Sequence, residues 1–199
     1  MHEVVDSLVI PARVAGDPAL ELCNTRAGWG EPVPKEYLVS YDHLLVWAHE
    51  AGLIDADRVE TLRRDADDAP AQAARVLSQV TAFREILYDY LTGNEDPQVW
   101  DAVVGRVESA TKAMTLVRST EGAQWAINPA VGLRYPLLAI AAAVGDLITS
   151  GDVRDVSVCP GRGCGWLFTN PTGRRRWCSM AICGNRAKAR RHAERHRRS

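Results

Sequence analysis

Four of the five cysteines lie within 25 residues near the end of the chain, as two pairs of identical C-x4-C spacing: Cys159 with Cys164, and Cys178 with Cys183. A tetrahedral zinc site needs four soft ligands at about 2.3 Å from the ion, and two short turns that supply two thiolates each are a common way to provide them. Glycines within and beside the first pair allow the backbone to bend tightly there. The spacing therefore predicts a structural zinc site, with these four cysteines as ligands and Zn²⁺ as the cofactor.

The same residues allow three other arrangements. Two disulfides would use all four thiols, but disulfides belong to oxidising compartments, and the first residues of the chain lack the basic and apolar segments of a secretory signal. A mixed site of Cys178, Cys183, His192 and His196 would leave the first cysteine pair without a role, although the two histidines are one helical turn apart. Four thiols simply exposed in a loop would be an oxidation hazard. We therefore expect the zinc site, in a cytoplasmic protein.

The residues around the second pair resemble a known signature. They read Arg175-Arg176-Trp177-Cys178-Ser179-Met180, followed by Cys183-Gly184-Asn185-Arg186. This is similar to the CGNR zinc-finger family of bacterial proteins, which are two-domain chains whose N-terminal part is called the ABATE domain and which are regarded as stress-induced transcription regulators. The resemblance implies bound zinc, DNA as a partner and a role in transcription regulation under stress. Segment 169–173 departs from the residues that the family usually carries between its cysteine pairs.

A second resemblance lies near the N-terminus. Asp17 and Pro18 are typical of a helix start, as the cap and the first helical residue. The apolar run that follows and ends in Asn24-Thr25 is similar to the N-terminal motif of the same family, which implies a ligand pocket lined by Asn24 and Thr25 for a small-molecule effector. The alternative is that both residues cap or bridge backbone at the helix end. Cys23 stands in an apolar context and is expected to be a buried core thiol.

Charge is distributed unevenly along the chain. The formal net charge is −1, but residues 1–150 carry 12 basic and 22 acidic side chains, whereas residues 151–199 carry 12 basic and 3 acidic ones. Zinc with four thiolates would take about two units from the positive end. A basic end after an acidic body predicts an anionic partner for that end. The simpler alternatives are a solvated helix, or a tail that docks on its own acidic domain.

The final helix is expected from about residue 182 to residue 198. At roughly 100° per residue, Ile182, Ala189 and Ala193 form a narrow apolar stripe for packing, and cations occupy the other faces. Such a helix can lie near a phosphate backbone. We therefore expect DNA as the partner, with RNA or an acidic protein as alternatives. The side chains assigned to this nucleic-acid interface are Arg174, Arg175, Arg176, Arg186, Lys188, Arg190, Arg191, Arg195, Arg197 and Arg198.

The fold class expected from the sequence is mainly α. Residues 4–14 predict a strand or two and residues 115–127 a β-hairpin, and Trp100 and Met114 are expected to face the core. Apolar residues at helical spacing, together with caps and glycine stops, predict helices over residues 40–51, 55–68, 70–93, 97–114 and 136–150.

These elements group into two domains. Residues 1–151 are expected to form a helical ABATE-like domain with a small β-hairpin. Residues 152–199 are expected to form a small four-cysteine zinc-binding domain that begins with a strand over 153–158, lies close against the body and ends in the basic helix.

The sequence does not indicate catalysis or a membrane location. A zinc site with four thiolates has no open position for water or substrate, and the chain has no Gly-rich phosphate loop, nucleophile elbow or HExxH motif. The apolar run within 136–150 is shorter than the ~20 residues that span a bilayer. We expect a zinc-containing transcription regulator that is not an enzyme. The alternative is a protein-interaction or redox-sensing module with a metabolite-binding helical domain.

Overall fold

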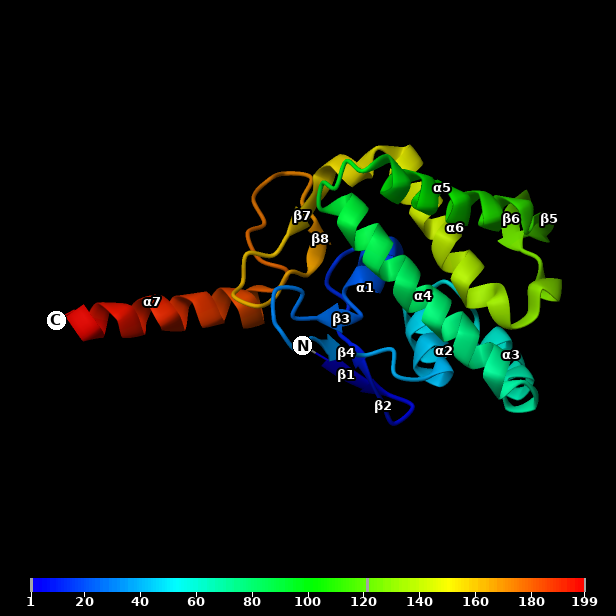
Figure 1. Cartoon of the computed structure of the whole chain (residues 1–199), viewed down its shortest axis with the longest axis horizontal. Helices are drawn as coiled ribbons and strands as arrows, with labels where there is room; N and C mark the ends of the chain where they lie inside the picture. Colours follow the sequence, from blue (N-terminus) through cyan, green and yellow to red (C-terminus); the bar gives the residue numbers. More distant parts are fainter. Residues whose placement is uncertain (1, 121, 199) are drawn as a thin grey trace.

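The computed structural model describes residues 2–120 and 122–198, without the side chain of Arg198, so the assignment of Arg198 to the nucleic-acid interface lies outside the described residues. A helical body, a small cysteine-containing unit and a projecting helix follow one another along the longest axis (Figure 1). The α-helices are α1 (Pro18–Cys23), α2 (Tyr41–Glu50), α3 (Ala56–Asp68), α4 (Pro70–Leu91), α5 (Pro97–Lys112), α6 (Tyr135–Ser150) and α7 (Asn185–Arg198). The shorter helical turns are η1 (Pro129–Arg134), η2 (Asp152–Asp155) and the π-helical η3 (Met180–Gly184). The expected mainly α fold with a four-cysteine end and a final helix is confirmed.

The strands of the described residues form two-stranded antiparallel sheets that are separate from one another. The expected hairpin over residues 115–127 and the expected N-terminal strands are both confirmed. The strand expected over 153–158 is shorter, because η2 occupies its first half. The pairs are β1 (His2–Val5) with β2 (Leu8–Pro11), β3 (Arg26–Ala27) with β4 (Lys35–Glu36), β5 (Met114–Ser119) with β6 (Gly122–Ile127), and β7 (Val156–Val158) with β8 (Leu167–Thr169).

Helix boundaries follow local capping chemistry. Asp17 accepts hydrogen bonds from the amides two and three residues later, which caps α1 as expected. Ser40, Asp55 and Asp96 cap α2, α3 and α5 in the same manner. Gly151 ends α6 with a φ of 84°, the left-handed conformation that glycine adopts without a steric penalty. These ends are therefore set by residues next to them in the sequence.

Helix α6 lies in the middle of the body, with Ile140 and Val144 fully buried. Together with η1 it forms the stretch Pro129–Ser150, the one helical stretch of the described residues that is long and apolar enough to cross a membrane. Gly132, with a φ of 57°, interrupts this stretch, and 56% of its apolar window is buried inside the body. That burial agrees with the expected central core helix.

Of the two side chains near α5 that were expected to face the core, Trp100 does not. Trp100 is 44% exposed, because its ring lies against Tyr90 of α4, at 5.6 Å between centroids, on the wall of an open groove of about 510 Å³ between α5 and α6. Met114 is half-buried and packs against the main core, as expected. It does so from strand β5, paired with Ile127, because α5 ends at Lys112, two residues before the expected end of this helix.

Strand β8 joins the cysteine-containing unit to the body. Successive side chains of a strand point to opposite faces. Leu167, fully buried, belongs to the main core of the body, whereas Trp166 and Phe168 on either side of it are buried with the cysteines in a second cluster. The small unit therefore lies close against the body, as expected.

Helix α7 does not pack as expected. Ala189 and Ala193 are exposed, and only Ala187, in the first turn, is buried. The reason is that α7 leaves the rest of the molecule directly after its first turn and projects away from it (Figure 1). The small residues further along the helix have no protein surface opposite them.

Candidate metal centre and nucleic-acid interface

The first cysteine pair lies on a tight loop between β7 and β8. The Cys159 amide donates to the Trp166 carbonyl at 2.8 Å, which closes the loop at its base. The Cys164 amide donates to the Gly161 carbonyl, also at 2.8 Å. Between them Gly163 has a φ of 66°, a conformation that residues with a side chain rarely adopt. The loop therefore turns both thiols toward the same point.

The second pair lies around the π-helical turn η3, which Cys178 precedes and which contains Cys183. A Cβ atom at Gly184 would lie 2.5 Å from Met180 Sδ, and a Cβ at Gly161 would lie 3.0 Å from Cys183 Sγ. Both distances are shorter than ordinary contacts. Glycine at these two positions therefore lets the two turns close around the thiols.

The four Sγ atoms all lie within 4.8 Å of one another. Cys178 Sγ is 3.6 Å from Cys164 Sγ and 3.7 Å from Cys183 Sγ. Four thiolates at about 2.3 Å from a zinc ion in tetrahedral geometry would be about 3.8 Å apart, whereas a disulfide has about 2.05 Å between its sulfurs. All five cysteines are free. The arrangement fits a four-thiolate metal site and not the alternative of two disulfides.

The mixed cysteine–histidine site is not formed. His192 and His196 lie on the exposed part of α7, with their Nε2 atoms 3.3 Å apart. Among the described residues, the four cysteines are the one group of three or more His, Cys, Asp or Glu side chains placed to hold a metal ion together, and neither histidine belongs to it.

The thiols of this cluster affect one another strongly. Hydrogen bonds from the Cys164 and Cys178 thiols lower the pKa of Cys159 to about 2. The hydrogen bond to Cys159 in turn raises the pKa of Cys164 to about 12, and that of Cys178 also rises above its ordinary value. The thiols thus oppose one another's deprotonation. A divalent ion would remove the repulsion among thiolates and allow all four to deprotonate, and a soft tetrahedral donor set suits zinc.

A model of the ABATE family, described as "Putative stress-induced transcription regulator", matches residues 16–151, which is more than half of the chain. The chain belongs to this family. A second model, described as "CGNR zinc finger", matches residues 156–196, a range that contains all four cysteines and most of α7. A search of curated proteins found no match. The two domains implied by the resemblance of the sequence are thus both present.

The ABATE domain holds the CGNR finger through Asn24, the residue that follows α1. Asn24 Nδ2 donates to the Leu167 carbonyl at 2.9 Å, and the Leu167 amide donates to Asn24 Oδ1 at 2.8 Å. Thr25 donates to the Leu22 carbonyl at 2.6 Å and accepts from Arg84 Nη1 at 3.0 Å. Asn24 and Thr25 are 0% exposed. These contacts agree with the alternative to a ligand pocket, in which the two residues bridge backbone at the end of a helix. Neither side chain reaches a surface where a ligand could bind.

Aromatic side chains extend this docking contact. Trp166 Nε1 donates to the Arg26 carbonyl at 2.9 Å, and the Tyr88 hydroxyl donates to the Gly165 carbonyl at 2.9 Å. The Tyr88 ring stacks on Trp29, with 3.6 Å between the ring centroids and 7° between the planes. Helix α4, which carries Tyr88, is therefore in direct contact with the first cysteine loop.

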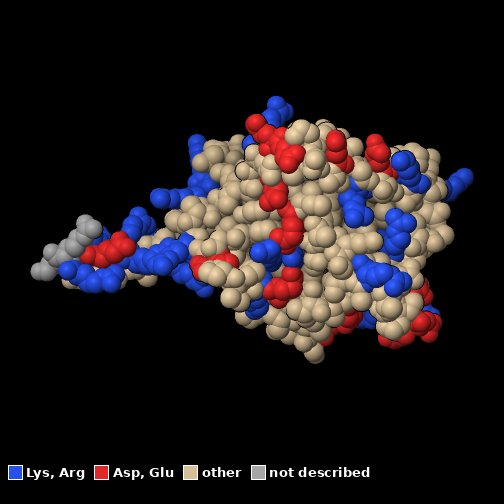
Figure 2. Space-filling model, viewed as in Figure 1, with Lys and Arg blue, Asp and Glu red and all other residues tan. Residues whose placement is uncertain are grey.

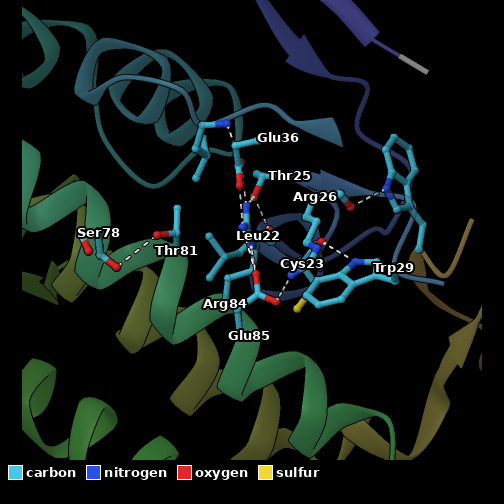
Figure 3. A network of polar contacts seen from close by, with 12 residues as sticks. Leu22, Cys23, Thr25, Arg26, Trp29, Glu36, Ser78, Thr81, Arg84 and Glu85 are labelled. Carbon is cyan, nitrogen blue, oxygen red and sulfur yellow. Dashed lines mark hydrogen bonds and ion pairs between the residues drawn. The ribbon is translucent and has the colours of Figure 1, made fainter. Parts of the chain in front are cut away.

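A network of charged side chains centres on the buried Arg84 (Figure 3). Arg84 is 3% exposed and donates to both carboxylate oxygens of Glu36, at 2.8 and 2.6 Å, and also to Glu85. Glu85 also pairs with Arg26. Burial lowers the pKa of Arg84, but the hydrogen bonds and charges of Glu36 and Glu85 raise it overall. The network connects α4 to the segment that holds the finger.

Arg175 is half-buried and makes bonds within the protein. Its guanidinium donates to the carbonyls of Val14, Trp177 and Cys178, and Cζ lies 4.5 Å from the centroid of the Phe168 ring. The folded finger thus uses this side chain to hold its own backbone against the N-terminal loop, and the assignment of Arg175 to the interface stays a prediction. Nothing in the local sequence distinguishes it from the arginines on either side.

The other assigned cations remain at the surface. Arg174 and Arg176 are exposed. Lys and Arg side chains are spread along α7 where it projects from the body (Figure 2). Its exposed cations, among the residues whose side chains are described, are Arg186, Lys188, Arg190, Arg191, Arg195 and Arg197. Arg162, exposed on the first cysteine loop, was not assigned by sequence reasoning, although its position between Cys159 and Cys164 was a usable signal.

Proposed function

We propose that the chain is a zinc-containing transcription regulator that binds duplex DNA through the CGNR finger and α7. The observation that carries the proposal is the projection of α7 away from the body, with its cations exposed to solvent. A helix of 14 residues is ~21 Å long, and the major groove of B-DNA is wide enough to admit it. Glu194 is the one acidic residue of α7.

Zinc is the ion proposed for the four-cysteine centre. Its part is structural: it would hold the two cysteine turns together and so fix the direction in which α7 leaves the body. A closed set of four thiolates offers no position for a substrate, which supports a binding protein and not an enzyme. The proposal places the protein in the cytoplasm, where such thiolates stay reduced.

The ABATE domain is proposed to carry the effector site. Asn24 bonds to the finger, Thr25 bonds to Leu22 and Arg84 within the ABATE domain, and both are fully buried, so we place the effector site elsewhere. One candidate is the groove of about 510 Å³ between α5 and α6, and another is a cavity of about 530 Å³ between α2, α3 and α4. Both volumes are in the range of small-molecule sites.

A salt titration of binding to a labelled DNA duplex tests the DNA proposal. Each phosphate contact contributes about 0.9 to the slope of log K against log salt concentration. The double change Arg190→Gln with Arg191→Gln should reduce that slope by about 1 to 2 and weaken binding to all sequences. The matched control is Arg75→Gln, an exposed arginine on α4 in the body. Its slope should equal that of the unchanged protein.

Three outcomes decide the proposal. Loss of binding in Cys178→Ser would support the metal-held finger as the part that positions the basic helix. If RNA or an acidic protein displaced the labelled duplex at a far lower concentration than unlabelled duplex DNA does, that partner would be favoured. No binding at low salt by the zinc-loaded protein would overturn the DNA proposal.

A further inference from the structure

We propose that His192 and His196 form a second zinc site on α7, separate from the four-cysteine centre. The two imidazoles lie one helical turn apart, with Nε2 atoms 3.3 Å apart and ring centroids 4.3 Å apart. Both side chains are exposed, on the part of α7 that projects from the body. The site has no residue in common with the metal centre of the finger.

The distance between the two nitrogens fits shared coordination of one ion. Zinc binds histidine nitrogen at about 2.0–2.1 Å, so two nitrogens at a tetrahedral angle are about 3.3–3.4 Å apart. Side chains at i and i+4 lie on the same face of a helix, and histidines at this spacing form part of known zinc sites. His192 and His196 therefore already have the separation that a bound ion would impose.

Two histidines fill half of a tetrahedral shell, so the remaining positions would belong to water or to an anion. The surrounding charge has a clear effect on affinity. Arg191, Arg195 and Arg197 are adjacent in sequence to the pair and repel a dication, and Glu194 is the one acidic residue of the helix. The site should therefore bind zinc far more weakly than four thiolates do, and an anion such as phosphate should strengthen it by completing the shell.

Such a site has a physical role in this chain. Helix α7 has 14 residues, and among those whose side chains are described only Ala187, in the first turn, is buried. Isolated helices shorter than ~12–15 residues are marginal in water. An ion that bridges His192 and His196 holds one full turn of the helix in place. It would order the basic helix around His192 and His196, where the described side chains, 191–197, are exposed.

The test uses the full chain, with its four-cysteine centre loaded with one equivalent of zinc and no DNA present. Further Zn²⁺ is added at a pH where imidazole is neutral, and calorimetry follows uptake while far-ultraviolet circular dichroism follows helicity. We expect one additional equivalent to bind, accompanied by a rise in helical signal. His192→Gln and His196→Gln should each abolish both effects. His43→Gln, which changes a histidine bonded to Ser40 on α2, is the control and should keep them.

A second control moves one histidine. The double change Glu194→His with His196→Gln leaves the number of histidines unchanged, but residues two apart do not face each other on a helix. This variant should not take up the additional equivalent. Uptake that survives in His196→Gln, or in this double variant, would overturn the proposal. So would the absence of any uptake by the unchanged chain, which would leave the pair as a simple histidine–histidine hydrogen bond. Zinc uptake and helicity are measured without DNA, so a failure of DNA binding would leave this test unaffected.

Discussion

The change Asn24→Leu tests the contact that holds the finger to the ABATE domain. Leucine has nearly the shape of asparagine but can neither donate nor accept a hydrogen bond. The change leaves the amide and the carbonyl of Leu167 without partners at a position that is 0% exposed. A buried polar group left unsatisfied costs about 1–3 kcal/mol, so two would cost about 2–6 kcal/mol. The loss of stability cannot exceed the free energy with which the finger docks on the ABATE domain, because water could reach both groups once the finger had undocked.

Two measurements on the zinc-loaded protein check this prediction. Urea unfolding should show a loss of stability within that range, and hydrogen exchange should show faster exchange of the Leu167 amide while the four cysteines still bind metal. Asn94→Ala is the control, because Asn94 also accepts from a backbone amide, that of Asp96, but does so at the surface where water can replace it. If Asn24→Leu were no more destabilising than Asn94→Ala, the docking role argued for Asn24 would be refuted.

Three further predictions concern the loop, the buried carboxylate and the metal. Gly165→Ala should destabilise the protein by about 1–3 kcal/mol more than Gly173→Ala in thermal unfolding. Both glycines have a φ of 67°, but only at Gly165 would a Cβ meet other atoms, the nearest at 2.7 Å. A difference near zero would contradict the close approach. Burial raises the pKa of Glu21 above its ordinary value of 4.5, so the folded chain retains this proton to higher pH than the unfolded chain does. Stability relative to Glu21→Gln should therefore fall as pH rises from 4.5 through the raised pKa, and a rise in that window would be the wrong sign. Finally, a zinc chelator should shift the fluorescence of Trp166 and Trp177 toward that of exposed indole while most of the helical dichroism remains, because α1 to α6 lie in the body. A cooperative loss of all helicity would show instead that the body depends on the metal.

The sequence by itself determined the features that depend on neighbouring residues. The C-x4-C pairs predicted the four-cysteine cluster, because each pair lies on one tight turn whose glycines set its shape. Capping residues such as Asp17 and Asp55 predicted helix starts, because a side chain that accepts from the next turn acts over three residues. The residues around Cys178 and Cys183 also carried the family resemblance that implied the two domains.

Only the tertiary structure decided which side chains are free and which are used inside the fold. Asn24 binds backbone 143 residues away, a partner that no local pattern reveals. Arg175 lies in a run of three arginines, yet it alone bonds to Val14 across the domain contact. Ala189 has the spacing of a packing face but no surface opposite it. The physical reason is common to all three. Capping and turn formation are completed within a few residues, whereas burial depends on what the rest of the chain brings to the other side.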